Sequence, residues 1–151
     1  MDRPLRLLIV DDCQDDADLL VAAVCRAGFA VSHAVVDTTP AMRAELQRQD
    51  WDVITSDYSM PQFSAPAAMA LAKELCPRVP FIVVSGEADP DRALSLMNDG
   101  ARDCIQKREL PRLIPAIEHA LRDVRDMQVL SVRRRRAQGP GDFGKPAPTL
   151  A

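Results

Sequence analysis

Short apolar runs alternate with segments of helical periodicity along most of this chain. Five runs have the length and the aliphatic content of buried strands, namely residues 5–10, 30–36, 53–57, 80–84 and 101–106. Apolar residues recur at helical spacing after each of them, in residues 14–27, 40–51, 65–75, 89–98 and 109–127. Strands that alternate with helices predict an α/β fold of the (βα)5 type, with a doubly wound parallel five-stranded sheet covered by helices on both faces.

Turn and cap residues mark the ends of several predicted helices. A threonine followed by Pro40, and Asp89 followed by Pro90, are typical of a helix start, because proline fits the first turn. Gly28 and Gly100 come just after two of the helices, where glycine commonly ends them. These signals agree with the alternation of strands and helices.

Polar residues follow the carboxyl ends of four of the five predicted strands. Asp11 and Asp12 come after the first strand, Asp57 ends the third, Ser85 follows the fourth and Lys107 follows the fifth. One Asp at such a place is usually a helix cap, and one Lys is usually a solvated surface charge. Because the carboxyl ends of parallel strands lie on one edge of the sheet, the joint pattern instead predicts a shared site.

The residue types at these strand ends suit phosphoryl chemistry. Three clustered carboxylates repel one another unless a cation joins them, and Mg²⁺ prefers such oxygen ligands. A carboxylate such as Asp57 can attack phosphorus and form an acyl phosphate. Lys107 would then neutralise the phosphoryl oxygens, and the Ser85 hydroxyl would donate a hydrogen bond to them.

The charge of the chain is unevenly distributed. Residues 1–128 contain 14 Lys and Arg against 21 Asp and Glu, a net charge of −7, whereas residues 129–151 contain 5 against 1, a net charge of +4. We therefore expect one domain over residues 1–128 and a basic, disordered C-terminal tail over residues 129–151. The four arginines at 133–136 lack neighbouring aromatic residues and a folded basic face, so nucleic-acid binding is not expected.

Apolar residues continue beyond the expected core in the last helix. Val129, Leu130 and Val132 could extend this helix and pair it with a second copy of the chain, so a homodimer through the last helix is one expectation.

Cysteine usage and hydropathy indicate a cytoplasmic protein. The four cysteines are widely and irregularly spaced and only two histidines are present, which argues against a disulfide framework or a zinc site. No apolar run approaches the roughly 20 residues of a membrane span, so we expect no membrane partner. The first strand begins by Leu5, which leaves no room for a signal peptide.

Several motifs together resemble the receiver domain of two-component response regulators, from residue 5 to about 126. They are Ile9-Val-Asp11-Asp12, Ser56-Asp57-Tyr-Ser-Met-Pro61, Val84-Ser85-Gly86, Gly100-Ala-Arg-Asp103 and Lys107. The resemblance implies a flavodoxin-like fold with the strand order 2-1-3-4-5.

The resemblance also implies a function and a set of site residues. Asp57 would accept a phosphoryl group from a phosphohistidine of a sensor histidine kinase or a phosphotransfer protein, and the charged protein would switch its binding to a downstream protein. Apart from its own phosphorylation and dephosphorylation, no enzyme activity is implied. The implied residues are Asp11, Asp12, Asp57 and the carbonyl of Ser59 for Mg²⁺, Ser85 and Lys107 for phosphate contact and switching, and Ser59 and Glu87 for phosphoryl lifetime.

Two positions depart from the family pattern. Cys104 stands where an aromatic switch residue is usual, and a cysteine is too small to report the switch in the same way. Arg108 follows Lys107 at a position where family members usually have a proline. The sequence around Asp57 and after Lys107 resembles a receiver subgroup found beside sensor kinase and PAS modules.

Other functions remain open at this point. A phosphatase of the haloacid dehalogenase type also uses an Asp nucleophile, but it carries Asp-x-Asp after its first strand, and this chain has Asp11-Asp12-Cys13. A receiver-like interaction module that works without phosphorylation is the second alternative. Only 23 residues follow residue 128, so we expect either a stand-alone receiver or a piece of a longer protein.

Overall fold

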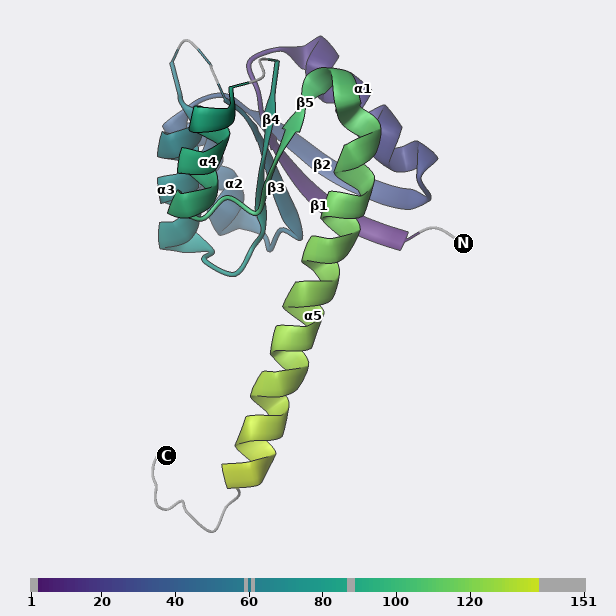
Figure 1. The fold of residues 1–151 in the computed structure, drawn as a ribbon, viewed down its shortest axis with the longest axis vertical. Coiled ribbons are helices and arrows are strands. Elements are labelled where there is room, and N and C mark those ends of the chain that lie inside the picture. The colour runs from purple at the N-terminus through teal and green to yellow at the C-terminus, as the bar shows by residue number, and fades with distance from the viewer. Residues whose placement is uncertain (1–2, 59, 61, 87–88, 139–151) are drawn as a thin grey trace. The chain divides into compact units, whose positions relative to one another are not determined.

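A computed structural model describes residues 3–58, 60, 62–86 and 89–138, with side chains described as far as Arg125. The chain divides into two units, Met1–Leu121 and Arg122–Ala151. The first unit contains all the strands and most of the helices (Figure 1). In the second unit, the described residues belong to the last helix.

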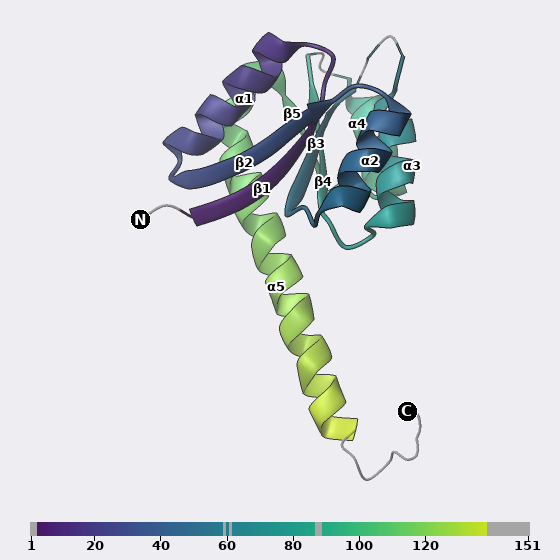
Figure 2. The same ribbon diagram turned by 180° about the vertical axis from the view of Figure 1, so that it is seen from behind.

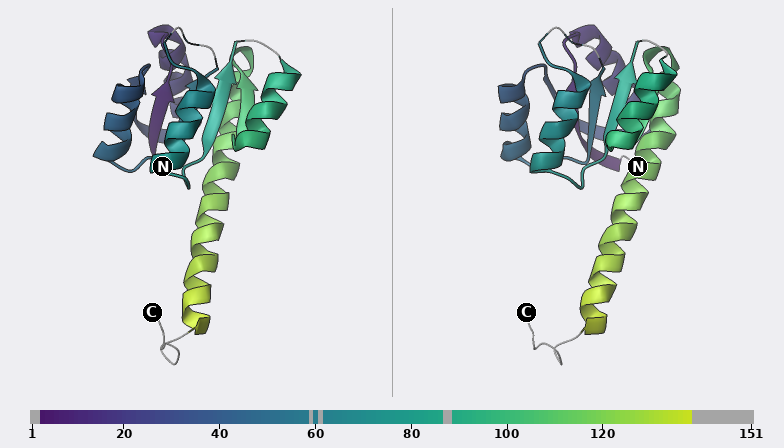
Figure 3. Two further views of the ribbon diagram at one scale, coloured as in Figure 1. Left: turned by 90° about the vertical axis from the view of Figure 1, so that its left-hand side faces the viewer. Right: turned by 60° about the vertical axis from the view of Figure 1, so that its left-hand side comes forward.

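The first unit is built on one sheet of five parallel strands in the order β2-β1-β3-β4-β5. The strands are β1 (Arg3–Val10), β2 (Phe29–Val36), β3 (Val53–Asp57), β4 (Phe81–Ser85) and β5 (Asp103–Gln106). This topology confirms the predicted flavodoxin-like fold. The arrowheads of the strands point to the same edge of the sheet (Figure 3).

Helices cover both faces of the sheet. They are α1 (Gln14–Arg26), α2 (Thr39–Arg48), α3 (Ala65–Leu75), α4 (Pro90–Asp99), the 3-10 helix η1 (Lys107–Arg112) and α5 (Leu113–Gln138). Helix α1 and the first turns of α5 lie on one face, and α2, α3 and α4 lie on the other (Figures 1 and 2). Among these helices of the described residues, none combines the length and the apolar character needed to cross a lipid bilayer.

The alternation of side chains along β1 explains the two-layered core. Leu7 and Ile9 pack with residues of α1 and α5, whereas Leu8 and Val10 pack with residues of α2, α3 and α4. All four side chains are fully buried, with at most 1% of the surface exposed. A strand that is apolar on both faces must lie inside a sheet covered by helices on both sides, so β1 is an interior strand.

Local capping explains why the helices begin where they do. The Thr38 hydroxyl accepts a hydrogen bond from the Ala41 amide at 3.2 Å, and the Asp89 carboxylate accepts one from the Arg92 amide at 3.2 Å. Each cap satisfies an amide that has no partner inside its helix. Gly100 ends α4 with a φ of +122°, which a side chain would strain.

The end of the chain's last helix differs from the prediction. Its predicted end near residue 127 is wrong, because α5 continues to Gln138. No proline or glycine interrupts the sequence between Pro115 and Gly139, so the helix has no sequence signal to stop earlier. Residues 129–138, which we assigned to the disordered tail, are therefore helical, in agreement with the other expectation that Val129, Leu130 and Val132 extend the helix. Residues 139–151 lie outside the described part.

The start of the same helix also differs. The predicted helix from about residue 109 is a 3-10 helix as far as Arg112, and the α-helix begins at Leu113. Pro111 has no amide hydrogen to donate, and Glu109 has a non-helical backbone, so a regular α-helix cannot run through this segment. The change places Lys107 at the first residue of η1, directly after β5.

Candidate functional site

The pairing of β1 with β3 brings two buried carboxylates together at the carboxyl edge of the sheet. Val10 of β1 is paired with Ser56 of β3, so the next residues, Asp11 and Asp57, lie side by side. One carboxylate oxygen from each of Asp11, Asp12 and Asp57 lies within 4.8 Å of the other two. The structure thus gathers the three acidic residues that the sequence predicted to share a site.

The three carboxylates differ in how deeply they are buried. Asp11 is 7% exposed and the Asp57 side chain is 11% exposed, whereas Asp12 is exposed to solvent. Burial raises the pKa of Asp11, against the effects of the Cys13 amide, which donates a hydrogen bond at 3.0 Å, and of the Lys107 charge. Burial also raises the pKa of Asp57, against the Lys107 charge and with a contribution from Asp11. Two partly desolvated carboxylates side by side favour a bound cation.

Lys107 supplies the positive charge at this edge. Its Nζ lies 3.4 Å from Asp11 Oδ2 and 3.5 Å from Asp57 Oδ1, and its side chain is 24% exposed. Burial lowers the pKa of Lys107, but the hydrogen bond to Asp16 and the charges of the surrounding carboxylates outweigh this effect, so the pKa is raised overall. The ammonium therefore stays protonated across the physiological pH range.

Asp16 is a further partner of Lys107, outside the three clustered carboxylates, that the sequence analysis did not identify. It lies in the first turn of α1, and its Oδ2 accepts a hydrogen bond from Lys107 Nζ at 2.6 Å. That hydrogen bond lowers the pKa of Asp16. Acidic residues in a first helical turn are ordinarily explained by the helix dipole. The position of Asp16 in the sequence therefore does not by itself indicate a contact with Lys107. The useful signal is that α1 begins at the same sheet edge as the other site residues.

Ser85 lies at the end of β4, between β3, which ends at Asp57, and β5, which precedes Lys107. It is the last residue of β4, where the preceding Val84 is paired with Asp57 and Ser85 itself is paired with Gln106 of β5. Ser85 therefore follows Asp57 along the sheet edge and lies one residue from Lys107 in register. Two other predicted site residues, Ser59 and Glu87, lie outside the described residues.

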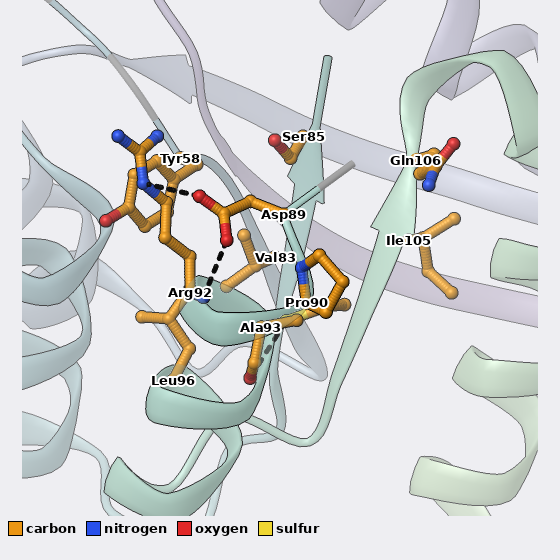
Figure 4. A pocket seen from close by; sticks show the side chains of 11 residues that line it. Tyr58, Val83, Ser85, Asp89, Pro90, Arg92, Ala93, Leu96, Ile105 and Gln106 are labelled. Atoms are coloured by element: carbon orange, nitrogen blue, oxygen red, sulfur yellow. Dashed lines mark hydrogen bonds and ion pairs between the residues drawn. The ribbon is translucent and has the colours of Figure 1, made fainter. Parts of the chain in front are cut away.

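The Cys104 departure coincides with a cavity beside Ser85. A cavity of about 160 Å³ opens between β4, β5 and α4, and Cys104 and Ser85 both line it (Figure 4). The Cys104 thiol donates a weak hydrogen bond to the Ala93 carbonyl of α4, with a sulfur–oxygen distance of 3.9 Å. Burial raises the pKa of this thiol, so the thiolate form is disfavoured. A small side chain at this position leaves the space open.

An aromatic ring forms another side of that cavity. Tyr58 follows Asp57 directly, and the Arg92 guanidinium lies 4.9 Å from the centre of its ring (Figure 4). Asp89 holds Arg92 through an ion pair at 3.2 Å. The residue after the buried carboxylate is therefore in contact with α4. This contact gives the sheet edge a direct connection to the helix that follows β4.

The donor set at the acidic cluster fits a hard divalent cation. Three carboxylates and one ammonium leave excess negative charge, and all the clustered donors are oxygen atoms, which Mg²⁺ prefers. A hollow of about 190 Å³, lined by Asp12, Asp37, Met60 and Gln62, lies beside the exposed member of the cluster. A cation and a phosphate oxygen could both approach from this side.

Comparison with known proteins gives a consistent match. The family model for the response regulator receiver domain matches residues 7–118. The two-component response regulator ORR1 of Oryza sativa subsp. japonica is 34% identical over 113 residues, which cover 68% of this chain and 48% of the relative. The chain thus spans about half the length of this relative.

Solved structures match the fold. The beryllofluoride-activated NtrC4 receiver domain dimer has a TM-score of 0.70 at 24% identity, covering 79% of this chain and 98% of that chain. NtrX from Brucella abortus has a TM-score of 0.77 at 24% identity, covering 91% of this chain and 30% of that chain. At this level of identity the likeness establishes the fold alone.

Proposed function

This chain belongs to the family of response regulator receiver domains of two-component systems, and from that premise we propose that it is a phosphorylatable switch whose phosphoacceptor is Asp57. The observation that carries the proposal is the placement of the Asp57 carboxylate. It lies within 4.8 Å of the Asp11 and Asp12 carboxylates and 3.5 Å from the Lys107 ammonium. A nucleophile for phosphorus needs this combination of a metal-binding acidic pair and a fixed cation.

Receiver domains generally bind Mg²⁺ at an acidic pocket, and Asp11, Asp12 and Asp57 would hold the ion in this chain. The backbone carbonyl of Ser59 is a further proposed ligand. When bound, the ion supplies positive charge that offsets the negative charge of the phosphoryl oxygens. The repulsion among the three carboxylates would favour binding of such an ion at this site.

The chain's own residues account for the remaining steps of phosphoryl transfer. One Asp57 oxygen forms a bond to phosphorus while the bond from phosphorus to the donor nitrogen breaks. The donor nitrogen keeps the electron pair and takes a proton from solvent. Lys107 neutralises a phosphoryl oxygen from its position beside Asp57, and the Ser85 hydroxyl, at the end of the neighbouring strand, donates a hydrogen bond to another.

Phosphorylation of Asp57 would then change the surface around α4. A phosphoryl group on Asp57 attracts Ser85 and Lys107, which lie at the ends of β4 and β5. Shifting such a switch from mostly off to mostly on takes roughly 5 kcal/mol of differential interaction. The cavity beside Cys104 gives the residues between β4, α4 and β5 room to move. This route does not require an aromatic residue at position 104.

The proposed partners follow from this chemistry. A sensor histidine kinase or a phosphotransfer protein would supply the phosphoryl group in the cytoplasm, and an unidentified downstream protein would read the switched surface. A second copy of the chain, paired through the last helix, is a further proposed partner, since α5 continues to Gln138. No turnover of an external substrate is proposed. Lifetime control by Ser59 and Glu87 also remains a proposal.

Intact-mass analysis with a small phosphodonor tests the function. With acetyl phosphate and Mg²⁺, the full chain should gain the mass of one phosphoryl group, and Asp57→Asn should gain none. The matched control is Asp50→Asn, which neutralises an exposed carboxylate before the opposite end of β3 and should be labelled like the wild type.

The same experiment separates the alternatives. Labelling that persists in Asp57→Asn would overturn the assignment of the phosphoacceptor. A wild-type chain that takes up no phosphoryl group would favour an interaction module that works without phosphorylation. Hydrolysis of a small phosphate ester that survives Asp57→Asn would favour a phosphatase, which the family match does not support.

A further inference from the structure

We propose that Asp16 is a positioning residue that competes with the phosphoryl group for Lys107 and thereby weakens the binding of phosphoryl-like anions at Asp57. The inference rests on the proposed function, and it concerns how strongly the site responds. It assigns a role to a residue outside the clustered carboxylates Asp11, Asp12 and Asp57.

The contact distances show which carboxylate holds the ammonium. Lys107 Nζ lies 2.6 Å from Asp16 Oδ2, a short charge-assisted hydrogen bond. The distances to Asp11 at 3.4 Å and to Asp57 at 3.5 Å are those of ion pairs at the outer limit of hydrogen bonding. In the resting protein, the strongest interaction of Lys107 is therefore with α1 rather than with Asp57.

Binding of a cation would strengthen this preference. A divalent ion held by Asp11, Asp12 and Asp57 would engage these carboxylates and would repel the Lys107 ammonium. Asp16 is not among the clustered ligands, so its carboxylate stays available to Lys107. A phosphoryl group on Asp57 must then attract the ammonium away from Asp16, or share it. Either case lowers the free energy gained from the contact between lysine and phosphoryl oxygen.

If Asp16 acted only on the helix dipole, substitutions of Asp15 and Asp16 would have the same effect on anion binding. Asp15 and Asp16 both lie in the first turn of α1, where a negative charge stabilises the helix. Asp15 is exposed to solvent, whereas Asp16 is half-buried and contacts Lys107. Substitutions at these two positions therefore separate the effect on the helix from the effect on the lysine.

The test is a titration of the full chain with beryllofluoride, a phosphoryl mimic, at saturating Mg²⁺, followed by NMR. Asp16→Asn should bind beryllofluoride several-fold more tightly than the wild type. The expected factor is about fivefold, which corresponds to the roughly 1 kcal/mol of a good exposed ion pair. Asp15→Asn should bind like the wild type. Asp16→Glu keeps the charge and should restore the wild-type affinity.

A second background shows whether the effect passes through the lysine. In Lys107→Gln, adding Asp16→Asn should change the beryllofluoride affinity by less than about twofold, because the contact at issue is already absent. A fivefold gain that persists in this background would mean that Asp16 acts on the anion directly, and would overturn the proposal. So would equal affinities for Asp16→Asn and Asp15→Asn.

These outcomes are distinct from a failure of the proposed function. If the wild type binds no beryllofluoride and takes no phosphoryl group, then the assignment of Asp57 is wrong, and Asp16 loses its role with it. If the wild type binds beryllofluoride and Asp16→Asn binds it no more tightly, then the function stands and the competition for Lys107 does not exist.

Discussion

Replacing Lys107 by methionine removes the positive charge that offsets the repulsion between Asp11 and Asp57. Methionine has a similar length and no charge, so the substitution preserves packing and deletes the ammonium. Asp11 and Asp57, which are 7% and 11% exposed in their side chains, would then face each other without this counter-charge. We expect the variant to be less stable than the wild type in metal-free buffer.

The size of the effect follows from the distances. At an effective dielectric constant of about 20, each pair of charges about 3.5 Å apart attracts by roughly 5 kcal/mol before solvation is counted. Burial of the ammonium offsets much of this attraction, and breaking a partly buried pair typically costs about 3 kcal/mol. For a chain of this size, that loss lowers Tm by about 10 °C.

The pH and metal dependence have definite signs. Burial raises the pKa of Asp11 and Asp57 in the folded state, and removal of the lysine charge raises both further. The destabilisation is therefore present above the folded-state pKa values and is lost as the pH falls through them, because protonated carboxyl groups do not repel each other. Saturating Mg²⁺ at neutral pH should also restore much of the lost stability.

Urea unfolding in EDTA, with and without Mg²⁺, measures this difference. Lys73→Met is the matched control, since Lys73 is exposed on α3 and its substitution should change stability by less than about 0.5 kcal/mol. Equal unfolding midpoints for Lys107→Met and the wild type in EDTA at neutral pH would refute the electrostatic reasoning.

Three further predictions concern other parts of the molecule. Gly100→Ala should cost about 1–2 kcal/mol in urea unfolding, because its φ is +122°, whereas Gly86→Ala should cost much less, since a Cβ there meets no atom within 4 Å. Thr38→Ala removes the cap of α2 and should cost about 1 kcal/mol in the same assay, and an unchanged unfolding midpoint would contradict this role of the hydroxyl. Iodoacetamide should modify the exposed Cys25 faster than Cys104 at neutral pH, and modification of Cys104 should rise only at higher pH, because burial raises its pKa; equal rates by peptide mass spectrometry would contradict this.

The alternation of strands and helices made the fold predictable from the sequence. The interior strands β3 and β4 are short and almost fully buried, and the cap and stop signals at Pro40, Asp89 and Gly100 fall where the helices begin or end. The end of α5 was predicted too early, although Val129, Leu130 and Val132 indicated that the helix could extend. Nothing in the residues after 127 stops a helix before Gly139, and a change of charge along the chain is not a structural boundary.

The acidic edge was predictable for a different reason. In a parallel sheet the carboxyl ends of all strands share one edge, so Asp11, Asp57 and Lys107 could be placed together from strand ends alone. Asp16 could not be placed that way, because it belongs to a helix and its contact depends on how α1 packs against the sheet. The cavity beside Cys104 likewise depends on the packing of α4 rather than on strand order.

A crystal structure of the full chain with Mg²⁺ and beryllofluoride would test most directly whether this edge receives a phosphoryl group. We predict beryllium bonded to a carboxylate oxygen of Asp57, Mg²⁺ bound by Asp11 and Asp12, and Lys107 Nζ within hydrogen-bond distance of a fluorine. Beryllofluoride bound at another residue, or a lysine directed away from the bound anion, would contradict the proposed site.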